Sequence, residues 1–262
     1  MSFSTNSLGN NGHLGNQMFQ YAFVKSMSIK HSRPFSIAPN EIFGKHYYQK
    51  LFSNIDECFD IKCDRKITKY LSINERCFHF DENMFEFPPE QSVDFVGYWQ
   101  SEKYFKHIED DLRADFTFKE DILNPCKEFV KSFQSLIAVH IRRNDFLKNP
   151  NHPVQDNSYY EKALCEFDND IPVLVFSDDV EWCQEQEMFS DDRFMISESG
   201  DAYSDLCLMS LCDHHVTCNS TFSWWGAWLA NSQNVIVPKK WFGGSNINLS
   251  TDDLYLSHWK IM

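Results

Sequence analysis

The sequence has few basic residues for its size and no long apolar run. Lys and Arg together number 24 against 38 Asp and Glu, so the formal net charge is −14. This deficit of positive charge argues against nucleic acid and anionic membranes as main partners. Any anionic ligand therefore has to be held by a local basic pocket.

Targeting segments are also missing from the sequence. No stretch approaches the roughly 20 apolar residues of a transmembrane helix. The N-terminal region has neither the basic start nor the apolar centre of a secretory signal. We therefore expect a soluble, cytoplasmic protein with at most peripheral membrane association.

Cysteine spacing typical of disulfides or zinc is absent as well. The nine cysteines are an odd number in a chain that is not small, and most of them, such as Cys165 and Cys183, lie inside apolar patterns. Cys207, Cys212 and Cys218 cluster with two histidines, but we expect the first two on a helix and the third at the end of a strand. That spacing does not fit a zinc knuckle. We expect no metal site and a reducing compartment.

A chain of 262 residues with 42% hydrophobic residues can form one large domain or two modest ones. Strand-like and helix-like segments alternate through its second half, which indicates right-handed βαβ units and a parallel, doubly wound sheet. We expect an α/β protein with an N-terminal domain over residues 1–133 and a C-terminal domain over residues 134–262.

Hydrophobic periodicity predicts the individual elements. Strands are expected at residues 93–98, 136–139, 171–176, 193–196, 214–218 and 234–237. Helices are expected at residues 120–133, 157–167, 180–189 and 200–212. A further helix follows Asn16, a plausible N-cap, whereas the polar, Ser-rich segment Met1 to Leu8 is a poor candidate for a strand.

Three of the expected strands end in polar clusters, which read HIRRND (140–145), FSDD (176–179) and CNSTFS (218–223). Ligands bind beyond the carboxyl ends of parallel strands, so three such ends in one sheet indicate a single crevice. Two neighbouring guanidinium groups, Arg142 and Arg143, suit a doubly charged phosphate, and the helix that starts within CNSTFS favours an anion at its N-terminus. The alternative is a salt-bridged loop in which Asp145 only neutralises one arginine.

Two other features have open interpretations. The segment GNNGHLGNQ (9–17) lacks the glycine spacing of the dinucleotide fingerprint, and is either a tight turn or a loop that lets a ligand approach a helix N-terminus. Tyr98 and Trp99, at a strand-to-helix turn, are either ordinary core residues or a sugar-stacking platform. By contrast, the tryptophans of WWGAW (224–228) are expected to pack a short apolar helix.

Taken together, the segments GHLGNQMFQYAF, GYWQSEKYF, HIRRNDF, FSDD and CNSTFSWWGAWLA resemble the α-1,2-fucosyltransferases of glycosyltransferase family 11. The resemblance implies a GT-B-like enzyme with two Rossmann-like domains, an acceptor-side one and then a GDP-fucose-binding one. It implies inverting transfer of L-fucose from GDP-β-L-fucose to O2 of a terminal galactose in a glycan, without a metal or cofactor. The alternatives are another GDP-sugar transferase, a protein O-fucosyltransferase or an inactive sugar-binding module.

The resemblance also assigns donor-side residues. Arg142 matches the arginine that holds the donor β-phosphate, and His140 matches its partner near the nucleotide. Asp205 matches an acidic residue that recognises guanine in related α-1,6-fucosyltransferases, since a carboxylate can accept from guanine N1–H and N2–H together. The remaining residues expected on the donor side are Asp178, Asn219, Ser220, Thr221 and Phe222.

On the acceptor side, the resemblance assigns the loop that reaches fucose and the acceptor, formed by His13, Gly15, Asn16 and Gln17. His13 stands where the family usually has glycine, and the polar start of the chain stands where it usually has an apolar strand. The expected catalytic residues are Arg142, Asp145, His140 and Asn16. Which group deprotonates the acceptor stays open between Asp145, His140 and a dissociative path that needs neither.

Overall fold

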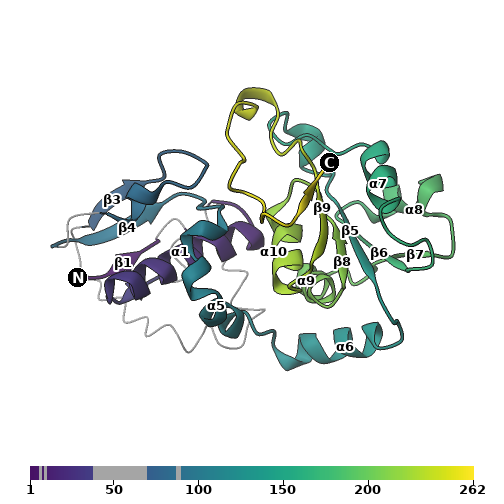
Figure 1. Ribbon diagram of the computed structural model, residues 1–262, viewed down its shortest axis with the longest axis horizontal. Coiled ribbons are helices and arrows are strands. Elements are labelled where there is room, and N and C mark those ends of the chain that lie inside the picture. The colour runs from purple at the N-terminus through teal and green to yellow at the C-terminus, as the bar shows by residue number, and fades with distance from the viewer. Residues whose placement is uncertain (6–7, 9–10, 38–69, 87–89) are drawn as a thin grey trace. The chain divides into compact units, whose positions relative to one another are not determined.

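The computed structural model describes residues 1–5, 8, 11–37, 70–86 and 90–262, and Figure 1 labels its main helices and strands. The chain forms two compact units. The first unit contains Met1–Lys119 and Ser250–Tyr255, and the second contains Glu120–Leu249 and Leu256–Met262. None of the helices in the described ranges is long and apolar enough to cross a membrane.

The described residues of the first unit form a four-stranded parallel sheet in the order β2-β1-β4-β3. The strands are β1 (Phe3–Ser4), β2 (Phe35–Ser36), β3 (Tyr70–Asn74) and β4 (Ser92–Val96). The helices are α1 (Leu14–His31) and α5 (Glu109–Asp115), with 3-10 helices η1 (Glu82–Phe85), η2 (Glu102–Tyr104) and η3 (Lys106–Ile108). Helix α1 packs against β1 and β2.

Strand β1 lies inside this sheet, so the prediction that the polar N-terminal segment forms no strand is wrong. Phe3 is fully buried, and the Ser4 hydroxyl donates to the Asp94 carboxylate at 2.9 Å. The backbone N–H of Ser2 donates to the Ser92 hydroxyl at 3.0 Å. The Ser4 hydroxyl is tolerated in the sheet because it has a hydrogen-bond partner on β4.

Helix α1 begins earlier than the sequence indicates. His13 occupies the N-cap position without a side-chain capping bond, so the prediction of Asn16 as N-cap is wrong. Asn16 lies in the first turn instead, where its side-chain oxygen accepts a hydrogen bond from the amide of Gln100 at 3.0 Å. The helix ends at His31, and Ser32 at its C-cap has a left-handed backbone.

In the second unit, the described residues form a six-stranded parallel sheet in the order β10-β9-β8-β5-β6-β7. The strands are β5 (Ile137–Ile141), β6 (Val173–Ser177), β7 (Phe194–Ile196), β8 (His214–Val216), β9 (Asn234–Val237) and β10 (Lys260–Ile261). The helices are α6 (Glu120–Val130), α7 (Asn157–Leu164), α8 (Val180–Gln184), α9 (Ala202–Ser210) and α10 (Thr221–Leu229). Short 3-10 helices are η4 (Phe146–Lys148), η5 (Glu187–Phe189) and η6 (Gly244–Asn246).

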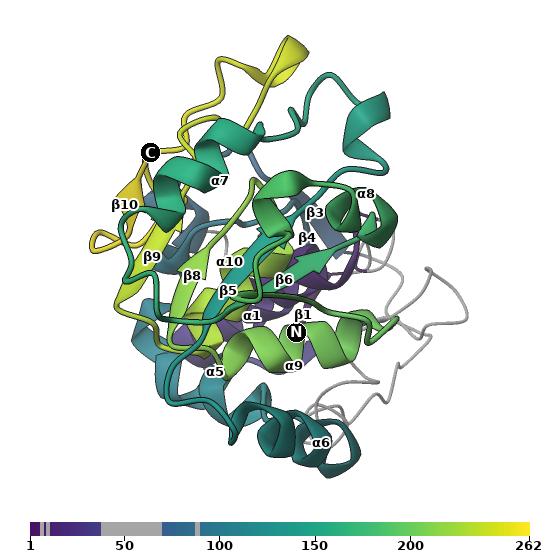
Figure 2. The ribbon, with the colours of Figure 1, turned by 90° about the vertical axis from the view of Figure 1, so that its right-hand side faces the viewer.

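Helices cover both faces of this sheet, as Figure 2 shows with α7 and α9 on opposite sides of β5. Alternate residues of the central strand point to opposite faces. Val139 packs with Tyr160 and Ala163 of α7, whereas Ala138 packs with Met209 of α9. A strand buried on both faces explains the continuous apolar run that predicted it, and the other strands predicted after residue 134 are also present.

The division between the units falls after Lys119, whereas the sequence pattern predicts a boundary after residue 133. Helix α6 belongs to the second unit because it packs against α9. Near the C-terminus the chain returns to the first unit over Ser250–Tyr255, where Leu254 is buried and Asp253 pairs with Lys103.

Candidate functional site

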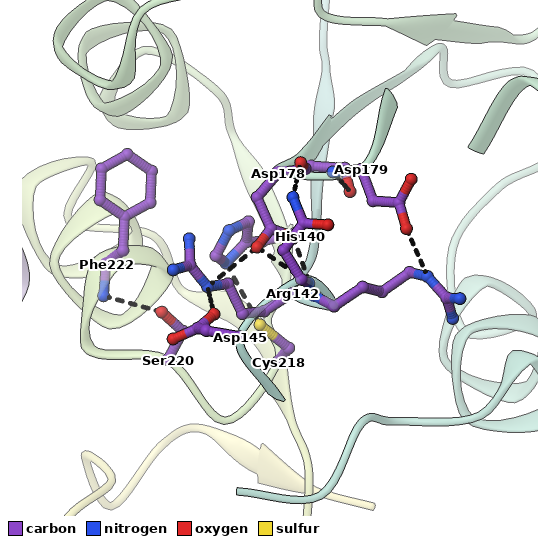
Figure 3. Close-up of polar contacts among 11 residues, drawn as sticks. His140, Arg142, Asp145, Asp178, Asp179, Cys218, Ser220 and Phe222 are labelled. Carbon is purple, nitrogen blue, oxygen red and sulfur yellow. Dashed lines mark hydrogen bonds and ion pairs between the residues drawn. The ribbon is translucent and has the colours of Figure 1, made fainter. Parts of the chain in front are cut away.

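The three polar strand ends do lie next to each other. Strand β5 pairs with β6 on one side and β8 on the other, with His140 opposite Phe176 and Val139 opposite Val216. Figure 3 shows the side chains that this arrangement gathers around Arg142. The sequence-based expectation of neighbouring strand ends is therefore confirmed within the second unit.

Asp178 holds the loop that follows β5. Its carboxylate accepts hydrogen bonds from the backbone N–H groups of Arg143 at 2.8 Å and Asn144 at 3.2 Å. The Asn144 amide donates back to the Asp178 carbonyl. The carboxylate thus satisfies two backbone donors of the turn, and its observed contacts fix the loop.

Two carboxylates hold Arg142 at one nitrogen of its guanidinium group. Its Nε lies 2.8 Å from Asp145 and 3.2 Å from Asp178, and the Asp145 side chain is more than half exposed. Among the described residues, no hydrogen bond or ion pair engages its two terminal amino groups. Figure 3 shows these groups directed to the side of the site where Ser220 and Phe222 lie. The guanidinium is therefore oriented while its bidentate edge is open to a ligand.

Arg143 is used differently. Its Nε binds Asp179 at 3.1 Å, and its guanidinium lies 3.8 Å from the ring centre of Trp182. The salt bridge of Asp145 that the alternative interpretation predicted is formed with Arg142, whereas Arg143 is paired with Asp179. The paired-arginine site expected from the sequence reduces to Arg142 alone.

His140 is a neutral imidazole in the core of the site. Its Nδ1 lies 3.2 Å from the Cys218 sulfur, and its ring centre lies 5.5 Å from that of Phe222. Burial, with a smaller contribution from the Arg142 charge, lowers the pKa of His140 to about 3. Burial also raises the pKa of the Cys218 thiol to about 12. At neutral pH both groups are uncharged, and a pKa of about 3 makes His140 a weak base.

Asn219 has its side chain fully occupied by protein partners. Its amide nitrogen donates to the carbonyls of Pro153 and Trp241, both at 3.0 Å, and its oxygen accepts from Gln155 at 2.9 Å. It is also buried. Asn219 therefore joins three loops rather than offering a group to a ligand, and Gln155 is a partner that the sequence analysis did not single out.

Helix α10 starts at Thr221, two residues after Asn219. The Ser220 hydroxyl is its N-cap and accepts from the backbone N–H of Phe222 at 3.3 Å, with Thr221 as first helical residue. The helix N-terminus is a favourable place for an anion. The tryptophans of α10 are buried, which confirms that they pack the helix.

Asp205 lies in the first turn of α9. One oxygen of its carboxylate accepts from the hydroxyls of Ser197 at 2.6 Å and Ser199 at 2.7 Å. The other oxygen, Oδ2, has no hydrogen-bond partner among the described residues. Burial raises the pKa of Asp205, and the two serine hydroxyls act in the opposite direction. Helix α9 packs against α10, which begins at the CNSTFS loop.

In the first unit, the loop expected to reach the acceptor enters α1. His13 is the N-cap, Asn16 is bonded to Gln100, and Gly15 and Gln17 are buried. Gly9 lies outside the described residues.

The neighbouring aromatic residues Tyr98 and Trp99 lie in different environments, one at the surface and one in the core. Trp99 is fully buried, whereas Tyr98 is 41% exposed. Glu75 contacts the backbone of both, and burial raises the pKa of Glu75 to about 7 against the effect of these hydrogen bonds. Glu75 cannot be singled out from the sequence alone, because a lone acidic residue after an exposed strand carries no distinctive pattern.

A family model described as glycosyl transferase family 11 matches residues 2–262. The chain is 33% identical to an alpha-1,2-colitosyltransferase of Escherichia coli, over 90% of this chain and 92% of the relative. It is 25% identical to galactoside alpha-(1,2)-fucosyltransferase 2 of Sus scrofa, over 86% of this chain and 70% of the relative.

Solved structures give a consistent picture of the fold. The fucosyltransferase NodZ from Bradyrhizobium superposes with a TM-score of 0.57 at 13% identity, covering 93% of this chain and 96% of that one. POFUT1 in complex with GDP-fucose superposes with a TM-score of 0.57 at 15% identity, covering 88% and 95%. At such identities the likeness shows the α/β glycosyltransferase fold alone.

Proposed function

The chain belongs to glycosyltransferase family 11, and from this premise we propose that it transfers L-fucose from GDP-β-L-fucose to O2 of a terminal galactose, with inversion at the fucose anomeric carbon. The names of the α-1,2-specific relatives support this linkage. We assign the two units to a GT-B-like pair of Rossmann-like domains, since each contains a parallel sheet with helices. In this assignment the second unit binds the donor.

The proposal rests on the way in which Arg142 is held by its neighbours. Two carboxylates hold its Nε, and no described residue forms a hydrogen bond or ion pair with its terminal amino groups. Such a preoriented fork suits the β-phosphate of GDP and stabilises charge that develops on the departing diphosphate. The N-terminus of α10, at Ser220 and Thr221, supplies a second favourable site for the same charge.

Asp205 fits the guanine end of the donor. Its open oxygen can accept from the N1–H and N2–H edge of guanine, while Ser197 and Ser199 hold the other oxygen. We place His140 and Phe222 beside the nucleotide. Asp178 and Asn219 then act on the donor through the loops that they fix.

We propose a direct displacement. The bond between the fucose anomeric carbon and the β-phosphate oxygen breaks as the acceptor O2 bonds to that carbon from the opposite face. The proton of the acceptor hydroxyl passes late to the departing diphosphate. Asp145 is paired to Arg142, and a pKa of about 3 makes His140 a weak base, so this path needs neither as general base. His13 and Asn16 are assigned to the acceptor side.

The test compares Arg142→Ala with Arg143→Ala in fucosyl transfer from GDP-fucose to a galactoside. The first variant should lose about 100-fold in rate, or about 3 kcal/mol of transition-state stabilisation, with an unchanged melting temperature. The second should melt earlier but keep its affinity for GDP, because Arg143 is paired with Asp179 and Trp182. Full activity of Arg142→Ala would remove Arg142 from the mechanism, and loss of activity in EDTA would contradict our proposal that the transfer needs no metal.

A second donor is favoured by the 33% identity to an alpha-1,2-colitosyltransferase. Colitose is fucose without its 3-hydroxyl, so the two GDP-sugars differ at a single position. Measuring kcat/KM for both donors with the same galactoside decides between them. A protein that binds glycans but is not stabilised by GDP would instead be a sugar-binding module.

A further inference from the structure

The turn that follows β4, Gly97–Gln100, is held by the carboxylate of Glu75. This residue directly follows β3, and its backbone N–H donates to the carbonyl of Val96 at 2.9 Å. One carboxylate oxygen accepts from the backbone N–H of Tyr98 at 2.7 Å, and the other from that of Trp99 at 3.0 Å. The carboxylate therefore fixes two consecutive peptide groups of the turn.

The backbone of this turn has an uncommon conformation. Trp99 has a φ of +57°, which a bulky residue rarely adopts. A side chain at Gly97 would place its Cβ 2.5 Å from the Cβ of Glu75, so only glycine fits there. A conformation of this kind persists only where its surroundings enforce it, and the Glu75 carboxylate and the packing of the buried Trp99 ring both do so.

The conformation sends two neighbouring aromatic side chains in different directions. Trp99 is fully buried and stacks on Phe23, with ring centres 3.9 Å apart and planes 5° from parallel. Tyr98 is 41% exposed, and its ring has no ring contact or side-chain hydrogen bond among the described residues. The structure thus fixes the backbone that presents the Tyr98 ring to solvent.

Polar groups lie at the same edge of the sheet. Strands β1 and β4 are parallel neighbours, so the loop that leads to α1 and the Gly97–Gln100 turn leave the sheet at one edge. The amides of Gln100 and Asn16 join these segments through a hydrogen bond of 3.0 Å. An exposed aromatic ring on the same turn as a side-chain amide is the composition of a sugar-binding surface, because pyranoses have both apolar C–H faces and hydroxyl groups.

We propose that Tyr98 is the contact residue for the acceptor sugar, stacking on the apolar face of the galactose-type pyranose, and that Glu75 is a positioning residue that holds it there. This proposal deepens the proposed function and rests on it. It assigns acceptor recognition to the exposed member of the pair and a packing role to Trp99.

The experiment measures acceptor KM, kcat, GDP affinity and direct galactoside binding by saturation-transfer NMR. The variants are Tyr98→Ala, Tyr98→Phe and Glu75→Gln, with Phe129→Ala as control, since Phe129 on α6 is also 41% exposed. Tyr98→Ala should raise the acceptor KM about tenfold and weaken the NMR signal, with GDP affinity and donor hydrolysis unchanged. Tyr98→Phe keeps the ring and should behave like the wild type.

Glu75→Gln retains only one oxygen acceptor for two backbone donors, so its acceptor KM should rise while its GDP affinity stays the same. Phe129→Ala should change none of these quantities. An unaltered acceptor KM and NMR signal in Tyr98→Ala would overturn the proposal. Failure of the wild type to bind GDP would instead reject the proposed function, and the NMR comparison would still decide the role of Tyr98 in galactoside binding.

Discussion

At the scale of single residues, the loop after β5 shows how partners from another strand decide what a side chain can do. Arg142 and Arg143 are equivalent in sequence, but Asp179 and Trp182 engage the second, and Asp145 and Asp178 hold only the Nε of the first. The two acidic neighbours of Arg142 also differ in how far their side chains are buried. The Asp178 side chain is 16% exposed and that of Asp145 is 56% exposed.

This difference gives a prediction for the free energy of unfolding. Asp178→Ala leaves two backbone N–H groups without their acceptor and should lower that free energy by about 1–3 kcal/mol. Asp145→Ala removes only an exposed ion pair and should lower it by less than about 1 kcal/mol. Urea titrations followed by circular dichroism measure both values, and equal losses would show that Asp178 does not hold the loop.

The sequence predicted that a polar site would form here, since strand ends of a parallel sheet converge. It could not show that Arg143 is engaged or that Asn219 joins three loops, because those partners lie 22 to 66 positions away in the chain. His140 is a similar case. Its weak basicity follows from burial, which no local pattern reveals.

At the scale of elements, prediction succeeded where a segment buries apolar residues on both faces and failed where polar residues pair. The run around Val139 predicted β5 because its side chains pack on α7 and α9. Strand β1 could not be predicted from the sequence because it is only two residues long and depends on a hydroxyl contact to β4. The prediction of Asn16 as the cap is wrong because its side chain accepts a hydrogen bond from Gln100, which belongs to a distant turn.

The contact between α9 and α10 gives a second stability prediction. A Cβ at Gly226 would lie 2.8 Å from the Cβ of Met209, an atom that can move only with its helix. Gly226→Ala should therefore lower the free energy of unfolding by about 1–3 kcal/mol despite the better helix propensity of alanine. Combined with Met209→Gly, which removes that Cβ, the two losses should fall short of additivity by more than about 0.5 kcal/mol. Strict additivity in this double-mutant cycle would show that the two residues are not in tight contact.

At the scale of the whole molecule, two buried histidines make stability depend on pH. Burial lowers the pKa of His140 to about 3 and that of His215 to about 4, against an ordinary value of 6.5. Below pH 6.5 the unfolded chain therefore binds protons that the folded chain does not. The free energy of unfolding should fall as the pH drops from 6.5 toward 4, and these groups have no effect above that window.

Each histidine should lower the free energy of unfolding by about 2 kcal/mol between pH 7 and pH 5. Comparing urea titrations of the wild type and His215→Gln at the two pH values isolates one of them, because the carboxylates common to both proteins cancel. On acidification, the free energy of unfolding of the variant should fall by about 2 kcal/mol less than that of the wild type. If the free energy of unfolding fell equally in both proteins, the proton uptake would belong to groups other than His215.

The short segment Ser250–Tyr255 has a consequence for dissecting the protein. Since it belongs to the first unit while the residues before and after it belong to the second, no single cleavage of the backbone can liberate either half intact. A fragment ending at Lys119 would lack the buried Leu254 and leave Lys103 without Asp253. Recombinant expression of the N-terminal half alone therefore requires this segment to be grafted back, as a peptide supplied in trans or through an engineered linker.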